Sequence, residues 1–185
     1  MEALLSEPGP IVLLGDLVSA FGADGHCALI LLLSIPFAIP LLPGMSSPVG
    51  FAILFIGLAY ARARPPKLPS RLARRSLPRE GVKKIVSKCR EWHVRVGRFL
   101  RPRGDFIQKK MGRVVVGSLF ALLGAELALP LPIPGTNTLP ALGLIALTLG
   151  ALERDGVWIA LGVGLSAIAT AYLAILMIAP TLFFR

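Results

Sequence analysis

A hydrophobic hairpin interrupted by prolines occurs twice in this chain and limits the folds open to it. The first copy runs from 26 to 61 and the second from 114 to 153. In each copy an apolar stretch reaches closely spaced prolines, a Pro-Gly pair, a few small polar residues and a second apolar stretch. The Pro-Gly pairs are Pro43-Gly44 and Pro134-Gly135. We interpret the pattern as an internal duplication of one helical hairpin.

The composition predicts an integral membrane protein rather than a soluble domain. Of the 185 residues, 55% are hydrophobic and 16% are charged, and the mean hydropathy is +0.74. A soluble domain of this size has too little interior to bury apolar stretches of such length. Because helices satisfy their own backbone hydrogen bonds in lipid, we expect one all-α membrane domain over 1–185.

The positive charge is concentrated in one loop. Eighteen of the 20 Lys and Arg residues, but only three acidic residues, lie in the segment 62–113. A basic loop between hydrophobic segments is placed in the cytoplasm by the positive-inside rule. Nucleic acid is an unlikely partner, because the loop contains no recognisable binding module and few aromatic residues. The lipid bilayer, with its anionic headgroups against the basic loop, is the expected partner.

Three further helices are predicted outside the hairpins. The segment 8–23 has apolar residues at helical spacing but is short for a span, so we expect it to lie on the membrane surface. The segment 79–100 has an apolar stripe among basic residues and is typical of an interfacial helix, the alternative being a helix packed on a soluble partner. The segment 157–179 is the clearest transmembrane helix, with small residues every four positions that favour close helix packing.

Two geometries are open for the hairpins. Either both arms cross the membrane as short helices, or two half-length helices enter and leave from one face as a re-entrant hairpin. Each proline at the turns removes a backbone donor and frees carbonyl groups of the preceding turn. Freed groups at membrane depth need protein or water around them. The turns are therefore expected to avoid lipid tails.

The polar residues at the turns are the candidate site. We expect Ser46 and Ser47 of the first turn and Thr136, Asn137 and Thr138 of the second to supply polar ligands for a solute or ion. Glu126 lies in an apolar stretch with no basic neighbour, and a carboxylate at that depth is a functional candidate. The charged residues Glu153, Arg154 and Asp155 end the second hairpin as a gate, an anchor or a solvated helix end. No catalytic constellation, metal ligand set or cofactor motif is expected.

The arrangement resembles the ExoD family of small bacterial membrane proteins, named for exopolysaccharide synthesis. The resemblance rests on the first turn at 39–44 with Ser46 and Ser47, the basic exit at 62–69, the helix end at 98–103, the second turn at 131–135 with Asn137, Leu139 and Pro140, and the cluster at 152–156. It implies a role in exopolysaccharide production or envelope physiology and a location in the bacterial inner membrane. It supplies no established catalytic residues.

Three functions compete on this basis. A transporter-like protein with a polar site where the two turns meet ranks first, because broken hairpins build such sites in secondary transporters. A non-transporting accessory or scaffold protein for exopolysaccharide synthesis, using the basic loop, is the alternative. An enzyme acting on lipid-linked sugars ranks last, because no catalytic constellation supports it. A homodimer is expected because a chain of 19.7 kDa leaves little protein to enclose a cavity.

Overall fold

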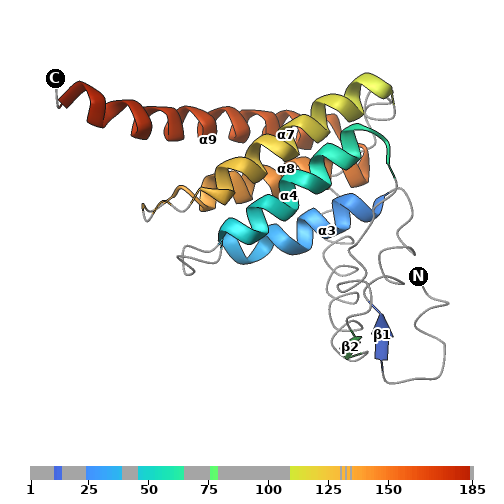
Figure 1. Ribbon diagram of the computed structural model, residues 1–185. Coiled ribbons are helices and arrows are strands. Elements are labelled where there is room, and N and C mark those ends of the chain that lie inside the picture. Colours follow the sequence, from blue (N-terminus) through green and yellow to red (C-terminus); the bar gives the residue numbers. More distant parts are fainter. Residues whose placement is uncertain are drawn as a thin grey trace.

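The computed structural model describes residues 11–13, 24–38, 46–64, 76–78, 109–129, 131, 133 and 135–183, and helices dominate this part of the chain (Figure 1). The elements are β1 Ile11–Leu13, α3 Gly25–Ser34, the 3-10 helix η2 Ile35–Ala38, α4 Ser46–Ala61, β2 Ser76–Pro78, α7 Lys110–Ala128, α8 Thr138–Glu153 and α9 Gly156–Phe183. The helical prediction is confirmed for both hairpins and for the C-terminal segment.

Helices α4 and α7 make the most extensive contact in the bundle, and they pack at backbone distance. A β-carbon added at Gly57 would lie 2.6 Å from the backbone nitrogen of Ala121, and one added at Gly124 would lie 2.6 Å from that of Leu54. Ala61 contacts Gly117 in the same way at the other end of the pair. Successive residues of α4 thus meet residues in reverse order on α7, so the two helices are antiparallel. Small residues permit this approach because no side chain separates the backbones.

Helices α3, α4 and α7 pack mainly on the other hairpin, whereas α8 packs mainly on α9. Helix α4 packs on α7, and α3 packs on α8 more extensively than on its own partner α4. Because α4 and α7 are antiparallel, the start of α4 lies beside the end of α7, which leads into the second turn. Figure 1 shows the start of α4 and the end of α7 on the left of the bundle, at the end toward which the C terminus of α9 also points. We call this the turn end, and the opposite end, where 62–64 and Lys109 lie, the loop end.

A tight turn joins α8 to α9 at the loop end. Arg154 has a left-handed conformation with φ 55° and follows the last residue of α8. The backbone N–H of Asp155 donates to the carbonyl of Gly150 at 3.0 Å. The two helices then return antiparallel, because Gly150 meets Ile159 and Gly162 meets Leu147. This turn fixes the direction of α9 along the bundle.

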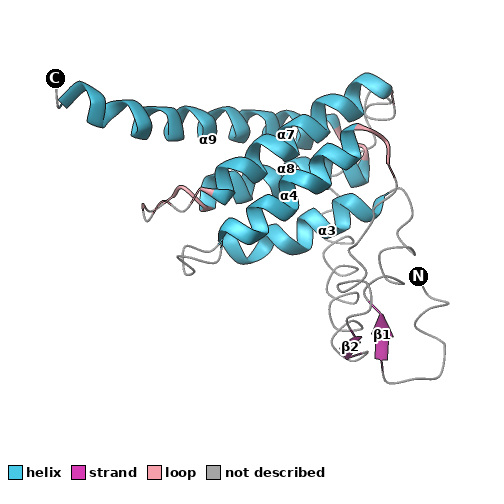
Figure 2. Cartoon of the chain, in the orientation of Figure 1, coloured by secondary structure: helices cyan, strands magenta, loops and turns pink. Residues whose placement is uncertain are grey.

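The hydrophobic core lies between α3, α4, α7 and α8. Its largest fully buried side chains are Phe120, Ile30, Ile53, Leu123, Leu127, Leu144, Leu147 and Val116. Helix α9 contributes much less, since only 17% of its apolar window is buried. Leu161, Ile168 and Ile175 of α9 are among the exposed large hydrophobic residues. Figure 2 shows α9 extending beyond the other helices. Its apolar surface therefore requires an apolar environment that the described part of the chain does not supply.

Two helices have the length and composition of membrane spans. These are α7, with 19 residues and a mean hydropathy of 1.5, and the part of α9 from Gly156 to Ala179, with 24 residues and a mean hydropathy of 2.1. Sequence reasoning recognised only the second as a clear span. Helices α4 and α8 have 16 residues each, or about 24 Å at 1.5 Å per residue. They are shorter than the roughly 30 Å hydrocarbon core of a bilayer.

The predicted surface helix 8–23 is wrong at three residues. Ile11–Leu13, inside the expected surface helix 8–23, form strand β1 and pair antiparallel with β2, with Val12 opposite Leu77. The β-branched Ile11 and Val12 favour an extended backbone, and pairing with a distant segment satisfies their hydrogen bonds. The rest of 8–23 and the expected interfacial helix 79–100 lie outside the described residues.

Candidate functional site

Glu126 is a buried carboxyl group in the last turn of α7, at the turn end of the bundle. Its side chain is only 6% exposed. Oε1 accepts a 2.6 Å hydrogen bond from the hydroxyl of Thr170 in α9. Oε2 is buried and has no hydrogen-bond partner among the described residues. A buried ionised carboxylate with one unpaired oxygen is costly, so the carboxyl group needs a proton, a cation or a polar ligand at that oxygen.

The Thr170 hydroxyl is within hydrogen-bond distance of two acceptors. Its oxygen lies 2.6 Å from Glu126 Oε1 and 2.9 Å from the carbonyl oxygen of Ser166. A hydroxyl group has one hydrogen to donate and two lone pairs to accept. When it donates to Ser166, a protonated Glu126 can donate to it; when it donates to Glu126, it pairs with Oε1 of the carboxyl group and leaves Oε2 without a partner among the described residues. The hydroxyl group can therefore bond to Oε1 in either protonation state, but the ionised form still needs a ligand at Oε2.

The second turn is stabilised by a hydrogen bond within it and packs on α9. Gly135 has φ 91°, a left-handed conformation that favours glycine. A β-carbon there would lie 3.7 Å from the ring of Tyr172, so the turn and α9 are in contact. The Thr136 hydroxyl is 2.7 Å from the carbonyl oxygen of Ile133, to which it donates, and only 5% of this residue is exposed. Thr136 thus stabilises the turn, and its hydroxyl is already occupied.

Asn137 and Thr138 begin helix α8. Asn137 is the N-cap residue but makes no side-chain capping bond. Its Oδ1 atom is buried and has no hydrogen-bond partner among the described residues. Thr138 is the first residue of α8 and is partly buried. Gly135 lies beside Tyr172 of α9, two residues after Thr170, so the second turn and Glu126 both meet α9 near the turn end.

The first turn contributes two serines to the same end of the bundle. Ser46 is the first residue of α4 and is 2% exposed, and Ser47 is partly buried. They lie one helical turn before Gly50, which meets the backbone of Ala128 at the end of α7. Both sets of predicted polar ligands therefore lie at the turn end. Pro43, Gly44 and Pro134, predicted to set the turn geometry, are outside the described residues.

The charged cluster lies at the opposite end from Glu126. Glu153, Arg154 and Asp155 form the α8–α9 turn, and the full length of α8 separates them from the second Pro-Gly turn. Asp155 is 1% exposed, and its Oδ1 accepts a 2.8 Å hydrogen bond from the backbone N–H of Val157. It therefore caps the start of α9. The cluster is not brought together with the other candidate residues.

Sequence reasoning missed Thr170 and the hydroxyl groups near it. Ser166 and Thr170 were interpreted only as small residues that permit close helix packing. Both hydroxyl oxygens also lie within hydrogen-bond distance of a carbonyl oxygen one turn earlier, Ser166 of Gly162 at 2.7 Å and Thr170 of Ser166 at 2.9 Å. Two hydroxyl residues four positions apart on an otherwise apolar helix share one face. That pattern could have indicated the face of α9 that receives a buried polar group.

These features define a helical protein with two helices of membrane-spanning length and a buried carboxyl group between them. The family model described as "Exopolysaccharide synthesis, ExoD" matches residues 2–175. The chain belongs to the ExoD family. It is 33% identical over 171 residues to Protein ExoD of Rhizobium meliloti, a match that covers 91% of this chain and 71% of that protein.

A second relative comes from a cyanobacterium. The chain is 27% identical over 151 residues to an uncharacterized protein of Synechocystis sp., covering 80% of this chain and 70% of that protein. No solved structure matches the chain. The comparisons thus establish the family and its link to exopolysaccharide synthesis.

Proposed function

We propose that this ExoD-family protein is a multi-pass protein of the bacterial inner membrane that moves a proton, or a small solute or ion coupled to one, in support of exopolysaccharide synthesis. In this proposal the protein itself catalyses no chemical reaction. The buried Glu126 carboxyl group bound to Thr170 is the observation that carries it. A titratable group buried within a candidate span is expensive to maintain and is typical of proton and ion pathways.

The lengths of its helices support a re-entrant form of the first hairpin, since α3 has 10 residues and α4 has 16. Helices α4 and α8 are about 24 Å long, whereas α7 and α9 have the length of spans. In a bilayer, hairpins whose second arms are short place their turns within or near the hydrocarbon region. The polar residues Ser46, Ser47, Asn137 and Thr138 would then line a polar region beside Glu126.

The distribution of charge supports an orientation with the loop end in the cytoplasm. Arg62, Arg64, Lys109, Lys110 and Arg113 lie where the basic loop leaves and re-enters the helices. The turn end then faces the membrane interior or the outer side. Lipid and a second copy of the chain are the proposed neighbours of α9, most of which is not covered by the described residues.

Reconstitution of the full chain in liposomes that contain a pH-sensitive dye tests the proposal. We expect an imposed pH gradient to collapse faster than in protein-free liposomes, and Glu126→Gln to abolish the difference because an amide cannot release a proton. Asp24→Asn removes an exposed carboxylate at the loop end and should leave the rate unchanged. Wild-type flux in Glu126→Gln, or no flux in the wild type, would favour the accessory function instead.

A further inference from the structure

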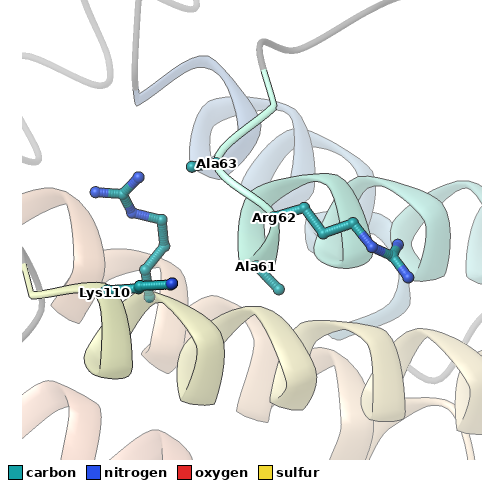
Figure 3. A pocket seen from close by; sticks show the side chains of 5 residues that line it. Ala61, Arg62, Ala63 and Lys110 are labelled. Atoms are coloured by element: carbon teal, nitrogen blue, oxygen red, sulfur yellow. The ribbon is translucent and has the colours of Figure 1, made fainter.

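A basic pocket lies at the loop end, between the end of α4 and the start of α7. It has a volume of about 310 Å³ and is lined by Ala61, Arg62, Ala63, Lys110 and Arg113 (Figure 3). Three of these five residues are cationic and none is acidic. The pocket is far from Glu126, since α7 runs between them from Lys110 to Ala128. The inference that follows therefore does not depend on the proposed proton pathway.

The three cations of the pocket have no acidic partner within the described part of the chain. Arg62 and Lys110 are exposed and Arg113 is partly buried. Figure 3 shows Lys110 on α7 and Arg62 at the end of α4, with the Arg62 side chain extending away from Lys110, so residues of two separate elements line the pocket. Lys110 and Arg113 lie three residues apart on one face of α7, so their like charges repel one another. An anion between them would relieve that repulsion.

The backbone around the pocket is held in place by specific contacts. Ala63 has φ 51°, its N–H donates to the carbonyl of Tyr60 at 3.0 Å, and the N–H of Arg64 donates to that of Ala59 at 3.0 Å. This pair of hydrogen bonds is the Schellman motif that ends a helix. Ala61 is packed against Gly117 on α7. The two elements that carry the cations are therefore fixed relative to each other.

The first turn of α7 adds to the positive potential. It contains no acidic residue, and Lys109 makes no side-chain capping bond there. The free N–H groups at the start of a helix carry partial positive charge. This contribution is secondary, because the cationic side chains and the pocket between them carry the argument.

We propose that this pocket binds a phosphate group, from the headgroup of an anionic phospholipid or from a soluble phosphate. Arg113 carries a planar guanidinium group of the kind that matches phosphate oxygens, Lys110 supplies a point charge, and Arg62 adds positive charge from the end of α4. The volume of about 310 Å³ accommodates a phosphate and part of its ester. The pocket also lies where α7, a candidate span, begins. Headgroups of an adjacent bilayer leaflet would be at this level.

Native mass spectrometry of the detergent-purified full chain tests the proposal with two lipids of identical acyl chains. We expect phosphatidylglycerol to remain bound and phosphatidylcholine to bind about tenfold more weakly, because its choline cation cancels the phosphate charge. Equal retention of both lipids would mean that acyl chains rather than the headgroup are bound, and would overturn the proposal.

Single substitutions then localise the binding. Lys110→Gln and Arg113→Gln should each weaken phosphatidylglycerol binding about tenfold, the effect of one charge-assisted hydrogen bond. Lys109→Gln removes the same charge one residue away, outside the pocket lining, and should change binding less than about twofold. Arg113→Lys retains the charge at the partly buried position and should preserve part of the binding. Equal losses in Lys109→Gln and Lys110→Gln would overturn the proposal, since general surface charge would explain them.

Competition with inorganic phosphate distinguishes the two sources. Displacement of phosphatidylglycerol by phosphate indicates that soluble phosphates reach the pocket, whereas retention of the lipid in excess phosphate identifies the membrane headgroup as its ligand. Either result supports a phosphate site. Failure of the wild-type chain to retain phosphatidylglycerol and to bind phosphate would contradict it.

Discussion

The hydroxyl of Thr170 in α9 donates a 2.6 Å hydrogen bond to the carboxyl group of Glu126 in α7. It links the two helices that have the length of membrane spans. The bond is partly buried and joins residues that are 44 positions apart. It therefore provides a polar contact between helices whose other contacts are few and apolar. Any movement of α9 along α7 has to break or exchange this bond.

Removing the hydroxyl group tests how much this bond contributes to stability. Thr170→Val should lower the free energy of unfolding by about 1–3 kcal/mol, because the buried carboxyl group loses its partner. Thr170→Ser keeps the hydroxyl group and should recover most of the loss. Chemical unfolding in detergent, followed by circular dichroism, measures both. Equal stability of Thr170→Val and the wild type would show that Glu126 is satisfied in another way.

The helices and the buried carboxyl group could be predicted from the sequence because both depend on local information. Long apolar stretches placed the hairpins and the C-terminal helix, and a single acid among apolar residues identified Glu126. The partner of Glu126 could not be predicted, since Thr170 belongs to another helix and only tertiary packing brings the two together. The same is true of β1, whose partner strand Ser76–Pro78 is distant in the sequence.

The packing of the arms of one hairpin on the arms of the other could not be predicted from the sequence either. Hydropathy indicates which segments are helices but not which helix each one contacts. One signal was present, however. Small residues recur at 50, 57 and 61 in α4, seven and four residues apart, and at 117, 121, 124 and 128 in α7, four, three and four residues apart. Matching stripes of small residues on two segments favour close contact between them.

This contact predicts that Gly124 cannot accept a side chain. A β-carbon at Gly124 would lie 2.6 Å from the backbone nitrogen of Leu54, so Gly124→Ala should destabilise the protein by about 1–3 kcal/mol through overpacking. Gly164 in α9 is a matched control, because a β-carbon there meets nothing within 4 Å. Gly164→Ala should be neutral or stabilising by up to about 1 kcal/mol, since alanine favours the helix. Thermal unfolding in one detergent compares the pair, and equal effects would contradict the close α4–α7 contact.

The α8–α9 turn predicts a structural role for Asp155. Asp155→Ala should reduce stability by about 0.5–2 kcal/mol, because the N–H of Val157 loses its capping acceptor. Asp155→Asn retains an acceptor oxygen and should be close to the wild type. Proton flux in liposomes provides the second readout. If Asp155→Asn remains folded but loses flux, the carboxylate acts as a gate and the structural interpretation is wrong.

The common position of the two turns gives the most direct prediction. Cysteines at Ser47 and Thr138, in a Cys27→Ala, Cys89→Ala background, should react with an impermeant thiol reagent from the same side of the membrane, because α4 starts where α7 ends. Cysteines at Ala63 and Arg154, both exposed at the loop end, should react from the opposite side. Labelling of these two cysteines confirms that the reagent is active and that the protein has the expected orientation in the membrane. Labelling of Ser47→Cys and Thr138→Cys from opposite sides would require hairpins of inverted orientation and would refute this arrangement. If neither cysteine reacts while the loop-end controls do, the turns are packed away from water, and the accessory function becomes the better account of the protein.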